Sequence, residues 1–128
     1  MTEPKRRPKV LAGHTHRVVT GCGNLYVTVN SDDQGPFEVF AHLGKSGQCG
    51  SAQIEAICRL ISVGLRAEVD VKAMIKQLTG IRCPSMLLSE GEEILSCADG
   101  IACALAKESG VERKKDILKD EHGLEKIN

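Results

Sequence analysis

The first half of the chain is dominated by positions that alternate between apolar and polar side chains. Residues 25–29 place Leu25, Val27 and Val29 on one face, and residues 37–42 repeat the alternation. Val18 and Val19 form a shorter β-branched pair ahead of Gly21-Cys22-Gly23, and residues 30–36 are dense in turn formers. The pattern predicts a three-stranded antiparallel meander.

After residue 51 the apolar spacing changes to intervals of three or four. Ile54, Ile57, Ile61 and Leu65 follow this period, which predicts a helix over 52–66 with Ser51 as its N-cap. This is the longest helix that the apolar pattern predicts.

Two shorter helices follow. Asp70 is placed to cap one that ends with Gly80 at its C′ position. Residues 96–99 have the capping-box form S-x-x-D and predict the start of another helix. Strands followed by helices, without strict βαβ alternation, favour an α+β domain: a small antiparallel sheet of about three strands followed by three helices packed on it.

The two ends of the chain lack the periodic apolar positions that its middle shows. Residues 1–13 carry a basic cluster and two prolines, and they predict an extended lead-in to a domain over 14–106. Residues 107–128 hold six positive and six negative side chains, which favours a solvated helix or a disordered tail.

Charge and composition exclude several function classes. Lys+Arg and Asp+Glu number 17 each, so no broad electrostatic field attracts nucleic acid or a membrane surface. One Tyr, two Phe and no Trp leave little for base stacking. Because we find no membrane-span-length apolar run and no signal h-region, we expect a cytoplasmic protein, with no nucleic acid or membrane as partner, whose cysteines are reduced thiols or metal ligands.

The six cysteines divide into two groups. Cys58 and Cys103 lie within predicted helices and are expected to be packing residues. The other four lie in turn or cap contexts, where structural zinc ligands are usually found: Cys22, Cys49, Cys83 and Cys97. They contain no CxxC pair, so their spacing leaves open both a four-cysteine metal site and scattered reduced thiols.

Three further features carry candidate chemistry. Cys97 is expected at the first position of a helix, where the dipole lowers a thiol pKa, so it is the best candidate for a reactive thiolate. Lys45, Ser46 and Gly47 lie in a glycine-rich loop able to bind an anion or nucleotide, although Val39 stands where a P-loop needs glycine, and a plain connecting loop is the alternative. His14-x-His16 on an extended segment would place both rings on one face.

Five ordered motifs resemble the TSCPD domain, which is found near the C-terminus of adenosylcobalamin-dependent (class II) ribonucleotide reductases and also as a small separate protein. The resemblance covers about residues 7–106. Its motif segments are residues 20–30, 36–40 with 44–49, 55–62, 80–84 and 96–99.

One departure from the family pattern concerns the motif that names it. Where that motif reads Thr-Ser-Cys-Pro-Asp, this chain has Leu95-Ser96-Cys97-Ala98-Asp99, which retains the Cys and Asp. Proline there only pre-sets a helix start, and alanine is compatible with one. The reductase barrel that binds cobalamin does not fit in 128 residues, so we expect no ribonucleotide reduction, and no catalytic residue, in this chain alone.

The resemblance also bears on the cysteines and on partners. The four loop cysteines fall within the family's motif segments, which implies a shared metal site, with zinc ahead of an iron–sulfur cluster. The resemblance implies an accessory domain or small subunit of a class II reductase, reaching adenosylcobalamin only through a catalytic partner chain. The alternative is an autonomous module that binds a metal and an anion or nucleotide. Self-association is left open.

Overall fold

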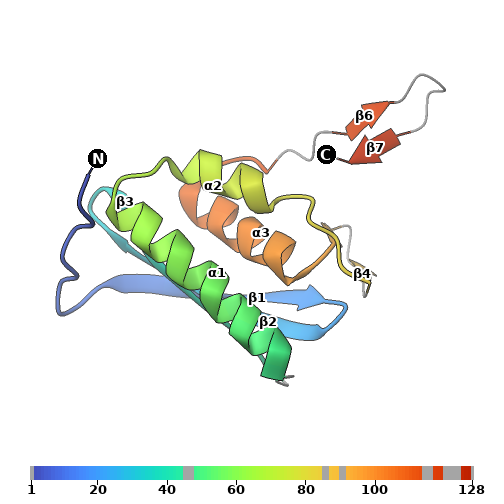
Figure 1. The fold of residues 1–128 in the computed structure, drawn as a ribbon, viewed down its shortest axis with the longest axis horizontal. Helices are drawn as coiled ribbons and strands as arrows, with labels where there is room; N and C mark the ends of the chain where they lie inside the picture. Colours follow the sequence, from blue (N-terminus) through green and yellow to red (C-terminus); the bar gives the residue numbers. More distant parts are fainter. Residues whose placement is uncertain are drawn as a thin grey trace.

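A three-stranded antiparallel sheet followed by three helices forms the body of the protein (Figure 1). The computed structural model describes residues 2–44, 48–84, 87–89, 92–113, 117–119 and 125–127. Its element order confirms the α+β class expected from the sequence.

The sheet has the strand order β1-β2-β3, so β1 and β3 are its edges. The strands are β1 (Ala12–Thr20), β2 (Gly23–Asp32) and β3 (Gly35–Leu43). Val29 of β2 is the register partner of His14 on one side and of Val39 on the other. Leu25, Val27 and Val29 are completely buried, as their alternation predicts. Each strand is longer than the apolar pattern alone indicates, because the polar residues beside both turns also pair.

The longest helix, α1 (Gln48–Arg66), begins four residues earlier than expected. Ser51 lies inside its first turns and is not its N-cap, which corrects the sequence-based assignment. The apolar period begins at Ile54, so a preceding polar turn leaves no mark in the pattern.

The two shorter helices begin where the sequence predicts. Asp70 caps α2 (Val71–Leu78) by accepting a hydrogen bond from the Lys72 N–H, and Gly80 follows with a φ of 88°. Ser96 caps α3 (Cys97–Ser109) by accepting from the Asp99 N–H.

The core lies between α3 and the sheet. α3 contacts all three strands, α1 runs along β3, and α2 packs on α3 (Figure 1). α3 is buried from Ala98 to Ala106, so it is the central layer of the helical side. Gly100 permits this approach, since a Cβ there would lie 3.2 Å from Leu25 Cδ2 and 3.3 Å from Val18 Cγ1.

Two short strand pairs lie outside the main sheet. β4 (Leu87–Ser89) pairs with β5 (Glu92–Ile94) between α2 and α3, where the apolar pattern predicts no strand. β6 (Ile117–Lys119) pairs with β7 (Glu125–Ile127), where the charge pattern favoured helix or disorder, and residues 107–109 continue α3. Three-residue strands are too short to give a readable alternation.

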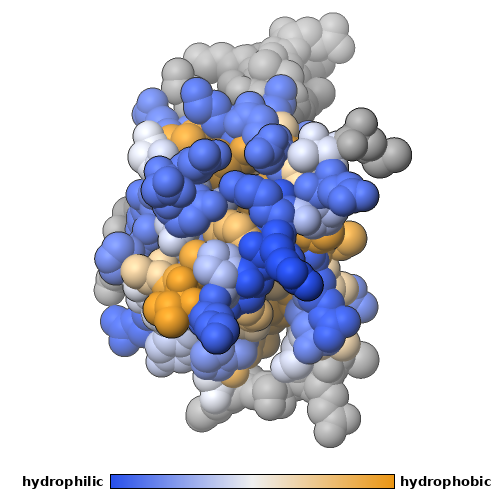
Figure 2. Space-filling model, turned by 90° about the vertical axis from the view of Figure 1, so that its left-hand side faces the viewer, coloured by the Kyte–Doolittle hydropathy of each residue, from blue (hydrophilic) through white to orange (hydrophobic). Residues whose placement is uncertain are grey.

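The lead-in packs against the domain. The Lys5 N–H donates to the Arg66 carbonyl and Arg66 Nε donates to the Lys5 carbonyl, both at 2.8 Å. Arg7 forms a two-pronged ion pair with Glu38. The face seen in Figure 2 is largely hydrophilic, with smaller hydrophobic patches between the charged side chains. In the described residues, no helix has the length and apolar character needed to cross a membrane.

Candidate cysteine site at the start of helix α3

Cys97 is the first residue of α3, and Thr20 connects it to the β1–β2 turn. The buried Thr20 hydroxyl donates to the Gly23 carbonyl at 2.9 Å and accepts from the Cys22 N–H at 3.1 Å. The same hydroxyl oxygen lies 4.0 Å from Cys97 Sγ. The tight turn that carries Cys22 is thereby held against the start of α3.

Asp99, two residues after Cys97, fixes the segments on either side. Its carboxylate is completely buried and accepts hydrogen bonds from the Gly80 and Leu95 N–H groups, each at 2.9 Å, and from Arg113 Nη1. A capping box would direct this carboxylate to the N-cap N–H, but here it reaches Leu95, one residue earlier. One side chain thus joins the end of α2, the entry to α3 and the chain beyond α3.

Cys83 is brought to the same region through the backbone. Its N–H donates to the Leu95 carbonyl at 2.9 Å, two residues before Cys97. Leu95 therefore has its N–H held by Asp99 and its carbonyl by Cys83. The segment after α2 and the entry to α3 lie side by side.

The pKa of the Cys97 thiol is raised above its ordinary value. Burial is the main cause that raises this pKa, the Thr20 hydrogen bond lowers it, and the neighbouring Cys22 and Cys83 thiols raise it further. The expectation of a lowered pKa at this helix start is therefore wrong, because burial disfavours the thiolate. Cys22, Cys83 and Cys97 come from three separate segments, and both other thiols act on the pKa of Cys97.

Comparison with known proteins identifies the family. The family model described as the TSCPD domain matches residues 2–109 of the 128. The chain belongs to the TSCPD domain family. No curated protein and no solved structure matches it. The TSCPD match includes the lead-in and ends before Arg113, so the cation that pairs with Asp99 comes from outside the matched region.

The structure places three of the four cysteines that the TSCPD resemblance singles out. Cys22 is exposed, whereas Cys83 and Cys97 are half-buried. The side chain of Cys49, in the first turn of α1, lies outside the described part, as do Lys45, Ser46 and Gly47 of the predicted anion loop. Within the described residues, no three His, Cys, Asp or Glu side chains are grouped closely enough to hold a metal ion.

The two helical cysteines belong to the core. Cys58 and Cys103 are each 4% exposed and lie in the main hydrophobic cluster. Burial raises the pKa of the Cys58 thiol to about 11, so it stays protonated at neutral pH. Both are packing residues, as their helical positions indicate.

The histidines of β1 share one partner that the sequence did not reveal. His14 Nδ1 and His16 Nε2 lie 2.9 and 2.6 Å from the same oxygen of Glu108 on α3. The two rings do lie on one face, as predicted from their spacing. Burial alone would raise the pKa of Glu108, but hydrogen bonds from His16 and His14 hold it below its ordinary value.

His42, on β3, instead stacks on Tyr26, with ring centroids 5.4 Å apart.

Proposed function

We propose that this TSCPD protein is an accessory domain or small subunit of a class II ribonucleotide reductase, and that Cys22, Cys49, Cys83 and Cys97 hold a structural zinc ion. On this proposal it acts in the cytoplasm, supports DNA synthesis by docking on a separate catalytic chain, and does not bind adenosylcobalamin itself. The family membership of residues 2–109 carries the proposal, because TSCPD domains are known from ribonucleotide reductases.

The convergence of three cysteines supports the metal part of the proposal. Thiolates are ligands that zinc prefers, and structural sites draw them from turns and helix starts. Cys22 lies in a turn and Cys97 at a helix start, while Cys83 follows the end of α2. The described thiols lack the close grouping of a formed site. Metal binding would therefore require Cys49 and a closer approach of the other three.

A zinc ion bound by four thiolates has no open coordination position, so it would supply cross-linking and no catalysis. Within the chain, Thr20 and Asp99 would position the ligands, because they hold the Cys22 turn and the Cys83 segment against α3. Metal uptake would also release the thiol protons, because zinc binds thiolates.

The metal part is tested by elemental mass spectrometry of protein purified without chelator or added metal. We expect one zinc per chain in the wild type and a loss of at least about 90% in Cys97→Ala, since removing one of four ligands opens a structural site. Cys103→Ala on the same helix is the matched control and should retain the metal. Absence of metal from the wild type, or equal metal in Cys97→Ala, would exclude the four-cysteine site.

The partner part is tested separately with the class II catalytic chain from the same genome. Mixed in equal amounts, the two should elute together in size-exclusion chromatography. Separate elution, with no change in reductase activity when this protein is added, would contradict the accessory role even if zinc is found.

A further inference from the structure

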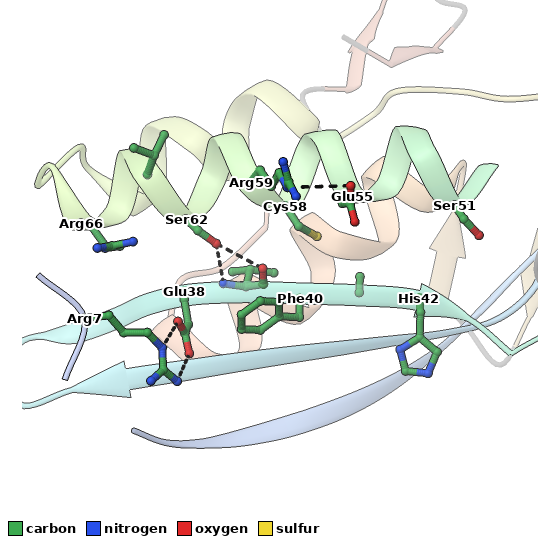
Figure 3. A pocket seen from close by; sticks show the side chains of 13 residues that line it. Arg7, Glu38, Phe40, His42, Ser51, Glu55, Cys58, Arg59, Ser62 and Arg66 are labelled. Carbon is green, nitrogen blue, oxygen red and sulfur yellow. Dashed lines mark hydrogen bonds and ion pairs between the residues drawn. The ribbon is translucent and has the colours of Figure 1, made fainter. Parts of the chain in front are cut away.

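A cleft of about 620 Å³ lies between α1 and β3 (Figure 3). One wall is the face of α1 that carries Ser51, Glu55, Arg59, Ser62 and Arg66 (Figure 3). The other wall is β3, and Arg7 lies at one end. The volume of the cleft is in the range of ligand-binding sites. The cleft contains none of Cys22, Cys83 or Cys97, so binding there does not depend on the proposed metal site.

The wall formed by β3 is the edge of the strand. Residues 38–42 all line the cleft, although successive side chains of a strand point to opposite faces. Val39 is buried on the core side, whereas Phe40 is exposed on the other. Five consecutive residues can line one cavity in this way only along the strand edge, where their backbone is accessible.

The hydrogen bonds of Val39 show which backbone groups point into the cleft. The Val39 N–H donates to Ser62 Oγ at 3.0 Å, and Ser62 Oγ donates to the Val39 carbonyl at 3.2 Å (Figure 3). Ser62 thus takes the place of a neighbouring strand at this one residue. In an antiparallel pair the direction of these groups repeats every second residue, so the N–H and carbonyl of Ala41 also point away from β2. Among the described residues, no side chain forms hydrogen bonds with the N–H and carbonyl of Ala41 as Ser62 does with those of Val39.

The charges that remain available in the cleft are mainly positive. Both oxygens of Glu38 are already used, by Arg7 at 2.8 Å and by Asn30 at 2.7 Å. Arg59 has only a 3.8 Å contact with Glu55, and both side chains are at least 70% exposed. Such a pair contributes little and yields readily to a competing anion. Arg66 donates its Nε to the Lys5 carbonyl and lies over the Phe37 ring, 5.5 Å from the centroid, with no ion pair at contact distance within the described residues.

We propose that the cleft between α1 and β3 binds an extended, acidic segment of a partner protein, which pairs with the backbone of Ala41 as an added strand. Strand addition to a sheet edge is a common mode of peptide recognition, with affinity from main-chain hydrogen bonds and specificity from side-chain contacts. Arg59 and Arg66 supply the charge complementarity, and Ser62 limits pairing to the part of β3 beyond Val39. A second copy of this chain is the less suitable occupant, because pairing two β3 edges would bring two sets of arginines together.

The test uses a hexapeptide of alternating glutamate and valine, titrated into the full-length protein and followed by amide NMR. We expect the amide signals of Ala41 and its neighbours on β3 to shift. The matching lysine–valine peptide should bind at least about tenfold more weakly, since it meets like charges. The glutamate–valine peptide methylated at alternate backbone nitrogens should not bind, because it cannot complete the ladder.

Variants of α1 test the charge contribution with a matched pair of opposite sign. Arg59→Gln should weaken binding about fivefold and Glu55→Gln should strengthen it by about the same factor, as expected for one charge at contact distance in water. Arg82→Gln, an exposed arginine outside the cleft, should leave the affinity unchanged.

Ala41→Pro tests the strand pairing directly. Proline removes an N–H that points away from β2, and an edge strand tolerates it there. This variant should fold and lose peptide binding, and if it does not fold, the methylated peptide tests the same hydrogen bonds. Equal binding of the acidic and basic peptides, or normal binding to a folded Ala41→Pro, would overturn the proposal. A concentration-dependent dimer blocked by Ala41→Pro would assign the edge to a second copy instead.

Discussion

Asp99 holds three parts of the chain together through one buried carboxylate. Its partners are backbone N–H groups of residues 80 and 95 and the guanidinium of Arg113. A charge completely removed from water is retained only where hydrogen bonds and an opposite charge surround it. The two N–H donors and the Arg113 guanidinium meet both conditions for Asp99, which lies two residues after Cys97.

Replacing Asp99 by Asn should therefore be costly. The amide cannot accept at both oxygen positions, and the Arg113 charge loses its partner while its side chain remains 12% exposed. We expect the free energy of unfolding, measured by urea denaturation, to fall by about 3 kcal/mol. Asp33→Asn, at an exposed turn position, is the control and should change it by less than about 0.5 kcal/mol. A loss below about 1 kcal/mol at Asp99 would contradict this role.

The sequence indicates the residue types of this site but not its connections. Ser96 and Asp99 are recognisable because a helix start has a local signature, and the structure confirms Ser96 as the cap. The bonds of Asp99 to Gly80 and Arg113 span 19 and 14 residues, and no local pattern encodes them. For the same reason the contact of His14 and His16 with Glu108 could not be predicted.

Among the secondary-structure elements, α3 determines how closely helix and sheet approach. Gly100 faces Leu25 and Val18 at distances that leave no room for larger side chains. By contrast, a Cβ at Gly50 of α1 would meet Leu43 Cδ1 at 3.7 Å, an ordinary contact. Two helical glycines thus have opposite packing constraints.

Gly100→Val should destabilise the protein by about 2–3 kcal/mol, because the added methyl groups push α3 away from the sheet. Gly50→Ala is the matched change and should be neutral or stabilise by up to about 1 kcal/mol through helix propensity. Thermal unfolding of both variants measures the difference. Equal midpoints for the two would show that α3 can shift without loss.

Strands β2 and β3 and helix α1 could be read from the sequence because each presents a periodic apolar face. Strand β1 was indicated by a β-branched pair, and α2 and α3 by their capping residues. The start of α1 could not, since its first turn is polar and glycine-containing. The strand pairs β4–β5 and β6–β7 were missed because three residues carry too little periodicity. The predicted elements are thus those with a periodic apolar face or a local capping or β-branched signal, and the missed ones lack these signals.

Across the protein as a whole, the described cysteines range from exposed at the surface to buried in the core. Cys22 is exposed, Cys83 and Cys97 are half-buried, and Cys58 and Cys103 lie in the core. Only a thiolate reacts with alkylating reagents, so burial slows the reaction of Cys58 and Cys97 both by limiting access and by raising the thiol pKa.

With iodoacetamide and a chelator at neutral pH, Cys22 should be alkylated first among the five cysteines whose side chains the structure describes. Cys58 and Cys103 should react only after unfolding in urea, because both are buried and the pKa of Cys58 is about 11. Mass spectrometry of proteolytic peptides at successive times measures each rate. Labelling of Cys103 as fast as that of Cys22 under native conditions would contradict the described core.

The position of α3 late in the chain has a consequence for synthesis on the ribosome. The sheet ends at Leu43, whereas the helix that covers its apolar face ends at Ser109. At a synthesis rate of about 5–20 residues per second, the face formed by Leu25, Val27 and Val29 stays uncovered for roughly 3–13 s until α3 has been made. During that interval the nascent chain presents an open hydrophobic surface, which is the kind of surface that chaperones bind.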